Sequence, residues 1–249
     1  MIKAFLFRRW WLFRRRIFST MAFVVALPII IHLALTLGIG NIIFETSTKL
    51  SYQKWLYPGL VFIVNTIVMI PIIYREFFDL RVNSRTLITL SLTPLSKLQL
   101  IGLLLLTALV EATIFSLVAM TIFLYLMDLS FNMLDLLYIL VAMNLFGLIV
   151  SNGLITISLL TDRINTFFIV TFIFFFFIIF SSELLFQFEF YPFRITAVLE
   201  NLPTSMVSNW CRSLMFNGYF YWTLFLPPLV IGLVWIIFNS LLLKRTIRQ

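Results

Sequence analysis

The chain has 249 residues, of which 62% are hydrophobic and only 11% are charged, and its mean hydropathy is +1.08. A water-soluble domain carries about a quarter charged residues, so a soluble fold of this composition would expose one continuous apolar patch. The composition therefore excludes a soluble protein and indicates a lipid bilayer as the solvent. The long apolar runs lack the period-2 alternation of barrel strands. We predict an all-α integral membrane protein with one transmembrane domain over residues 1–249, because helices pair their own backbone groups.

Several classes of site are excluded by absent residues. The single cysteine, Cys211, and the single histidine, His32, leave no disulfide framework and no multi-thiolate or histidine metal cluster. The sequence has no G-x-x-x-x-G-K-[ST] phosphate loop, no G-x-S-x-G and no H-E-x-x-H. We therefore expect no enzyme activity, no catalytic residue and no cofactor bound by this chain. The net charge of +8 would suggest nucleic acid in a soluble protein; here it bears on membrane orientation, and we expect no nucleic-acid partner.

Residues 1–18 combine basic and aromatic side chains in a helical pattern. The apolar stripe comprises Ile2, Leu6, Trp10, Phe13 and Ile17. Such a stripe, flanked by arginines, is typical of an amphipathic helix lying in the headgroup layer. The alternative is that these charges merely precede the first span as orientation signals.

Six later segments are apolar and long enough to cross the membrane, since a spanning helix needs about 20 residues. They are residues 19–40, 57–74, 99–127, 134–160, 164–182 and 222–243. The second is expected to begin at Tyr57-Pro58-Gly59, and the sixth to be entered through Pro227-Pro228.

Basic residues divide unequally between the two sides that six spans define. Four lie on one side: Lys49, Lys54, Arg194 and Arg212. The other fourteen of the 18 lie in the two termini and the two remaining loops: Lys3, Arg8, Arg9, Arg14, Arg15, Arg16, Arg75, Arg81, Arg85, Lys97, Arg163, Lys244, Arg245 and Arg248. Because basic loops stay in the cytoplasm, we expect both termini inside, in the inner (plasma) membrane of a bacterial cell.

Two connections between the spans are long. Residues 75–96 are charged and polar, and Arg75 to Leu92 can form a short cytoplasmic helix that stops at Pro94. Residues 183–221 are too apolar for a solvated loop and too short in their parts to cross. We expect short helices at 195–201 and 204–216, punctuated by Pro192, Pro203 and Gly218, in a re-entrant outer hairpin.

Polar side chains inside the spans are the usual indicators of function. Glu111 could contact a substrate or carry a proton, but pairing with a neighbouring helix is the simpler interpretation. His32 is interpreted as a packed histidine. The run Asn144, Ser151, Asn152 is interpreted as contacts between helices, helped by neighbouring glycines. The four phenylalanines at 174–177 are interpreted as facing lipid or a partner subunit, with an oily substrate path as the lesser alternative.

Four features, in order, resemble the membrane subunits of the type-2 ABC-transporter exporter family, which moves drugs, lipids and polysaccharides. They are the N-terminal interfacial helix; Tyr57-Pro58-Gly59-Leu60; Arg75-Glu76 followed by Thr86 and by Leu92-Thr93-Pro94-Leu95-Ser96; and Pro203-Thr204 with Arg212 and Gly218. The resemblance covers essentially the whole chain. The sequence departs from the family at Asn83-Ser84-Arg85, where Gly-Thr and a further glutamate are usual.

The resemblance implies a permease subunit that dimerises and binds two copies of a separate ATPase, on which ATP and Mg²⁺ would sit. It implies a cytoplasmic coupling helix at 75–96, and we expect Arg75, Glu76, Asp79, Arg81, Thr93 and Pro94 to contact the ATPase. Candidates for a translocation path near spans two and five are Tyr57, Asn65, Glu111, Phe174 and Phe177. Pro203, Arg212 and Gly218 mark the outer hairpin.

The expected substrate is amphipathic or lipid-like: a drug, a lipid or a lipid-linked glycan. Outward direction is implied by the resemblance alone. A non-transporting membrane scaffold or assembly factor is the alternative, since an amphipathic N-terminus and a long outer hairpin would serve there too. A membrane-embedded transferase or hydrolase fits less well, because no paired acid and base share one leaflet.

Overall fold

The computed structural model describes residues 7, 11, 14, 17–38, 51–84 and 96–247. These residues contain α-helices and no β-strand. The helices are α2 (Ile17–Ile31), α4 (Tyr52–Ile73), α5 (Leu80–Val82), α7 (Lys97–Leu126), α8 (Met133–Leu160), α9 (Ile164–Ser181), α10 (Phe193–Leu199), α11 (Pro203–Arg212) and α12 (Trp222–Ile247). Wider π-type turns, η1 (His32–Leu37), η2 (Tyr74–Asp79) and η4 (Ser213–Asn217), extend three of them, and η3 (Phe188–Phe190) is a single 3₁₀ turn. The all-α prediction is confirmed.

Within the described residues, five helices are long and apolar enough to cross a membrane, which confirms a multi-pass membrane protein. They coincide, to within one residue at an overhanging end, with five of the six predicted spans, from 57–74 to 222–243. The remaining predicted span, 19–40, corresponds to a shorter apolar helix, Met21–Leu37. Most of the predicted interfacial helix at 1–18 lies outside the described residues. Two of its residues that are described, Phe7 and Trp11, are helical and have exposed side chains.

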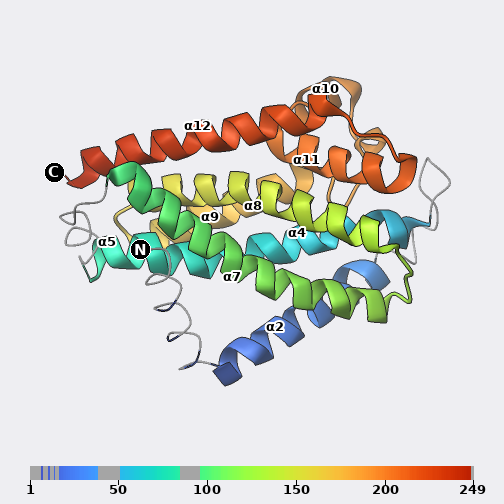
Figure 1. The fold of residues 1–249 in the computed structure, drawn as a ribbon, viewed down its shortest axis with the longest axis horizontal. Helices are drawn as coiled ribbons and strands as arrows, with labels where there is room; N and C mark the ends of the chain where they lie inside the picture. The colour runs from blue at the N-terminus through green and yellow to red at the C-terminus, as the bar shows by residue number, and fades with distance from the viewer. Residues whose placement is uncertain are drawn as a thin grey trace.

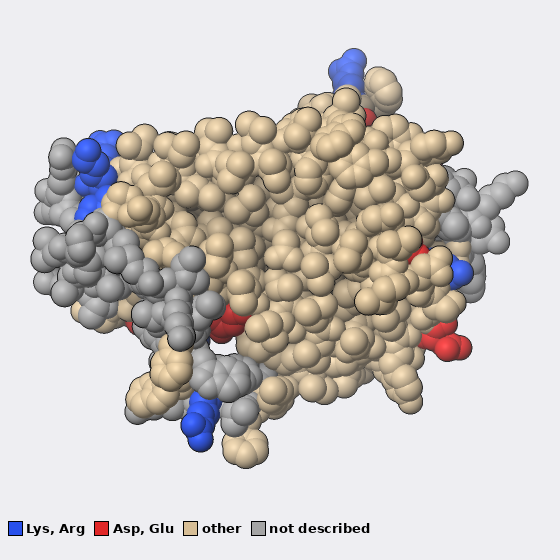
Figure 2. All heavy atoms as spheres, viewed as in Figure 1, with Lys and Arg blue, Asp and Glu red and all other residues tan. Residues whose placement is uncertain are grey.

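The central helix of the bundle is α4. It packs against α7 and α8, while α12 packs against α8 and α11, and α2 packs against α7 (Figure 1). In the apolar stretch of α4, 83% of the residues are buried inside the protein, whereas in that of α12 only 22% are. The face of the bundle in Figure 2 is a broad uncharged surface, with charged side chains mostly toward its edges. Such a surface suits lipid and would not suit water.

Helix starts follow local capping chemistry. Ser96 Oγ accepts a hydrogen bond from the Gln99 amide at 3.2 Å, and Gln99 Oε1 accepts one from the Ser96 amide at 3.1 Å. Asn132 and Asp135 form the same capping box at the start of α8. Each box satisfies amide donors that the first helical turn leaves without a partner.

Prolines begin fewer helices than the sequence indicates. Helix α4 starts at Tyr52, so Pro58 lies inside it, and α12 starts at Trp222, so Pro227 and Pro228 lie inside it as well. The predicted start of the second span at Tyr57 therefore lies inside α4, whereas the sixth predicted span, 222–243, begins at the residue where α12 begins, and only its predicted entry through Pro227-Pro228 is wrong. Membrane helices tolerate proline because packing against neighbours compensates for the lost hydrogen bond.

Charged residues after the second span extend α4. The helix runs unbroken from Tyr52 to Val82, through the π-type turn η2. The predicted coupling helix from Arg75 therefore begins as the last turns of α4, and residues 85–95, with Thr93 and Pro94, lie outside the described part of the chain.

The segment between α9 and α12, called the outer hairpin after its predicted side, has its short helices close to the predicted positions. Helices α10 and α11 stand where short helices are expected, and Pro192 and Pro203 precede or open them. Gly218 ends η4 with φ +70°, a left-handed conformation that glycine adopts without strain.

Packing of α4 against the outer hairpin depends on one glycine. A Cβ added at Gly59 would lie 2.2 Å from the backbone oxygen of Leu184, a contact that no side-chain rotation relieves. We expect Gly59→Ala to lower stability by about 1–3 kcal/mol through overpacking, measured as a lower midpoint of thermal unfolding in detergent. The control is Gly102→Ala in α7, where nothing lies within 4 Å of the added methyl. An unchanged midpoint for Gly59→Ala would contradict this close approach.

The α8–α12 contact depends on a buried amide network. Asn239 Nδ2 donates to both Asn152 O and Asn152 Oδ1 at 3.1 Å, and Thr156 donates to Asn239 Oδ1 at 2.7 Å. We expect Asn239→Leu to destabilise the protein by about 1–2 kcal/mol, since the lost partners lie away from water. Thr121→Val serves as the control, because Thr121 is exposed and donates to Val118 of its own helix. Equal unfolding midpoints for the two variants would refute a role for the network.

Candidate functional site

The C-terminal end of α4, called the inner end after its predicted cytoplasmic side, carries four of the residues predicted to couple to a partner: Arg75, Glu76, Asp79 and Arg81. All four follow the last apolar turn, and three lie within η2. A π-type turn widens the helix by one residue, and such turns occur frequently at functional sites. The described structure shows where each of these side chains is held.

Arg75 links α4 to α7. Its Nη2 donates to Glu111 Oε1 at 3.1 Å and to Oε2 at 3.2 Å, and its Nε lies 3.5 Å from Glu76 Oε1. The Glu76 side chain is only 1% exposed and that of Glu111 19% exposed. Inside a membrane protein such charges persist because they are paired. The interpretation of Glu111 as pairing with a neighbouring helix is confirmed.

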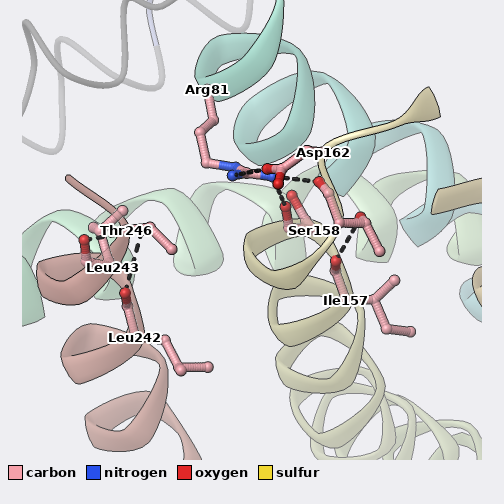
Figure 3. Close-up of polar contacts among 8 residues, drawn as sticks. Arg81, Ile157, Ser158, Asp162, Leu242, Leu243 and Thr246 are labelled. Carbon is pink, nitrogen blue, oxygen red and sulfur yellow. Dashed lines mark hydrogen bonds and ion pairs between the residues drawn. The ribbon is translucent and has the colours of Figure 1, made fainter. Parts of the chain in front are cut away.

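Arg81 closes the inner end of α8. Its Nη1 lies 2.7 Å from Asp162 Oδ1, and its Nη2 donates to the backbone oxygens of Ser158, at 3.0 Å, and Thr161 (Figure 3). A helix leaves its last carbonyls without intrahelical donors, and a guanidinium can satisfy them. Arg81 therefore caps α8 and fixes the end of α4 to it.

Asp79 is the more exposed of the two acids predicted to couple to a partner. It is partly exposed and accepts a hydrogen bond from Asn83 Nδ2 at 2.8 Å, within the same helix end. Glu76, by contrast, is buried against its own chain. Of the two acids, Asp79 is the one whose side chain reaches the surface of the described structure.

An aromatic cluster attaches the start of α9 to the same helix end. The Tyr74 ring lies 5.4–5.5 Å from the rings of Phe78, Phe167 and Phe168, and Phe78 lies 5.0 Å from Phe167. Ring pairs at these distances stabilise packing beyond their buried area. Sequence reasoning missed this cluster; the i, i+4 spacing of Tyr74 and Phe78 was the available signal.

Three of the predicted path residues lie in the seam between α4 and α7. Tyr57 donates to the backbone oxygen of Met120 at 3.1 Å, Asn65 donates to Ser116 Oγ at 3.2 Å, and Glu111 holds Arg75. These side chains join two helices of one chain, and Tyr57 and Asn65 are at most 1% exposed. Polar contacts of this kind hold transmembrane helices together.

The two predicted path residues of α9 differ in exposure. Phe174 is half-buried, because its ring covers Gly153 of α8, whereas Phe177 is 54% exposed on the outer face of α9. The Phe run thus contributes both packing and an exposed aromatic surface.

The predicted contacts between helices at Asn144 and Asn152 are confirmed. Asn144 Oδ1 accepts a hydrogen bond from Thr113 of α7 at 2.9 Å, and Asn152 joins α8 to α12. Ser151 instead donates to Leu148 of its own helix. His32 is buried on η1, as expected of a packed histidine.

Arg212 organises the outer end of the bundle. Its Nη1 lies 3.3 Å from Glu183 Oε2, its Nη2 donates to the Glu183 backbone oxygen at 2.6 Å, and its guanidinium lies 3.8 Å from the centre of the Trp55 ring. Glu183 adopts φ +55°, which costs energy for a residue with a side chain. The pKa of Glu183 is raised by burial, an effect that the charge of Arg212 opposes.

Two serine hydroxyls add hydrogen bonds to the contacts of Arg212 with Glu183 and Trp55, and together these contacts are called the outer clamp. Ser182 Oγ donates to Thr204 Oγ1 at 2.7 Å, and Ser208 Oγ donates to the Ser182 backbone oxygen at 2.7 Å. Of the predicted hairpin residues, Arg212 therefore fastens α11 to α4 and to the end of α9, while Pro203 and Gly218 set the ends of the helical segment.

No metal centre is found in the described part of the chain, where no three His, Cys, Asp or Glu side chains lie together. Cys211 is buried in α11, and burial raises the pKa of its thiol to about 12. Such a thiol is inert at neutral pH.

The outer clamp should be a stability determinant. We expect Arg212→Gln to cost about 3–5 kcal/mol, because it leaves the Glu183 carboxylate buried without its charge partner. Adding Glu183→Gln should restore part of the loss. Thermal unfolding in detergent measures both variants, with Arg194→Gln on the exposed side of α10 as the matched control. A double variant no more stable than Arg212→Gln alone would argue against this pairing.

Comparison of the chain with protein-family models, with curated proteins and with solved structures finds no match.

Proposed function

We propose that this chain is the membrane subunit of an ATP-driven exporter of the type-2 ABC permease kind. Two copies would form the permease, each docked on a separate ATPase subunit that carries ATP and Mg²⁺. The substrate would be amphipathic or lipid-like, moved out of the cytoplasm or the inner leaflet. The multi-pass helical architecture supports the proposal. The choice of this exporter family rests on the order of the sequence motifs.

The observation that carries the proposal is the length and charge of the α4 helix. Its 31 residues from Tyr52 to Val82 give a length of about 46 Å at 1.5 Å per residue, whereas the hydrocarbon core is about 30 Å thick. Asp79 and Arg81 lie in the part of the helix that exceeds the thickness of the hydrocarbon core. A rigid charged helix end that continues directly from the most buried span is suited to receive a push from a soluble motor.

Contacts within the chain would transmit that push. Arg75 ties α4 to α7 through Glu111, and Arg81 ties it to the end of α8. A displacement of the α4 end would therefore move three helices together. ATP is required because a binding equilibrium shifts populations between two access states but cannot cycle them in one direction.

The remaining elements take roles consistent with this mechanism. The apolar helix Met21–Leu37 would serve as a sixth span and place both termini in the cytoplasm. Helices α10 and α11 are too short to cross, and α11 packs on α8 and α12, as a re-entrant hairpin would. Exposed rings on α9, among them Phe172, Phe176 and Phe177, offer an oily face for the second subunit or for substrate.

The proposal is tested in a complex with the ATPase encoded nearest the gene for this chain. After co-expression and reconstitution in nanodiscs, ATPase activity is measured across a panel of lipids, glycolipids and amphipathic drugs. We expect at least one substrate to stimulate ATP hydrolysis. Asp79→Lys should reduce that stimulation about tenfold, as expected from loss of a typical coupling free energy.

Glu200→Lys is the matched control, because Glu200 is an exposed acid at the opposite end, after α10. Full stimulation in the Asp79→Lys complex would refute coupling through the α4 end. A chain that neither binds a phosphate-loop ATPase nor alters its activity would instead fit a membrane scaffold.

A further inference from the structure

A cavity of about 560 Å³ opens at the inner end of the bundle, between the ends of α5, α8 and α12. Its lining comprises Arg81, Leu159, Leu160, Asp162, Leu242, Arg245 and Thr246. Figure 3 shows Arg81 and Asp162 on one side and the last turns of α12, with Leu242 and Thr246, on the other. The coupling mechanism above uses Arg81 of this lining, through its contact with the end of α8, but assigns no role to the cavity itself.

The lining divides into a charged rim and an apolar wall. The rim holds two guanidinium groups and one carboxylate, so it carries a net positive charge. The wall is built from three leucines, Leu159, Leu160 and Leu242. A ligand that fits both must join an anionic group to an apolar chain.

The two arginines are held differently. Arg81 is 14% exposed and pre-ordered by Asp162 and the end of α8, so little side-chain freedom is lost when a ligand binds. Arg245 is exposed in the last turn of α12, on a helix end whose dipole favours cations. One guanidinium held by its partners and one exposed to solvent can hold a phosphate from two sides.

The position of the cavity favours a lipid phosphate over other phosphate compounds. Helices α8 and α12 are spanning candidates, so their last turns lie near the boundary between hydrocarbon and headgroups. Basic pockets between helices at such a boundary bind anionic lipid headgroups. Leu160, 63% exposed, continues the apolar wall toward the lipid-facing surface.

We propose that this cavity binds an anionic phospholipid, with the headgroup phosphate between Arg245 and Arg81 and the start of an acyl chain along the three leucines. Asp162 competes with the phosphate for Arg81, which sets a moderate affinity and lets lipid exchange. The site needs only a bilayer and is independent of the export function proposed above.

The experiment titrates the delipidated full chain in detergent with phosphatidylglycerol or with phosphatidylcholine of the same acyl chains, and counts bound lipid by native mass spectrometry. Phosphatidylglycerol should bind more tightly. Arg245→Gln should weaken its binding about tenfold, as loss of a charge-assisted hydrogen bond does, and Arg245→Lys should recover part of the affinity. Asp162→Asn should strengthen binding, because it removes the competing carboxylate while the carbonyls at the end of α8 still hold Arg81.

Arg194→Gln removes one exposed charge at the opposite end of the bundle and should leave the affinity unchanged. The proposal is overturned if Arg245→Gln binds phosphatidylglycerol as the unaltered chain does, or if Arg194→Gln weakens binding equally. Competition by glycerol 3-phosphate at the same concentration as the lipid would also overturn it, in favour of a water-soluble phosphate ligand. Binding of an acidic peptide in preference to lipid would identify the cavity as a protein contact instead.

Discussion

Polar side chains on α4 have to find partners inside the protein, since hydrocarbon offers none. This constraint explains the seam between α4 and α7. Tyr57 reaches Met120, Asn65 reaches Ser116, and Arg75 reaches Glu111, so the polar groups of one helix meet those of its antiparallel neighbour from the outer to the inner end. Each contact fixes the register of the two helices, because a slip would leave a buried polar group without its partner.

At each end of the bundle an arginine supplies hydrogen-bond donors to polar groups that need partners inside the protein, but the two arginines do so differently. At the inner end Arg81 satisfies the last carbonyls of α8. At the outer end Arg212 stacks on Trp55 and pairs with Glu183, which joins α4, α11 and the residues after α9. Guanidinium groups suit both positions, since their planar donors bind several oxygens and their faces stack on rings.

This arrangement makes α4 the element that connects the two ends of the bundle. It is the most buried span, it contacts the outer hairpin through Gly59, and it projects charged residues at the inner end. The cavity lined by Arg81 lies beside its last turn, between the ends of α8 and α12.

The sequence by itself determined the solvent and the class of fold. Hydropathy and the run lengths indicated membrane helices, and the glycine and prolines of the outer segment marked α10 and α11 within a few residues, because these features act locally. The start of the second span was placed at Tyr57, inside α4, and Pro227-Pro228 lie inside α12 and do not mark its entry, since neighbouring helices compensate for a missing backbone donor. The partners of Arg75, Arg81 and Arg212 were decided only by the tertiary structure. Each contacts a residue 29 to 81 positions away, as a spacing along one helix could not reveal. The sequence indicated that these charges matter, and packing decided that they hold the bundle together.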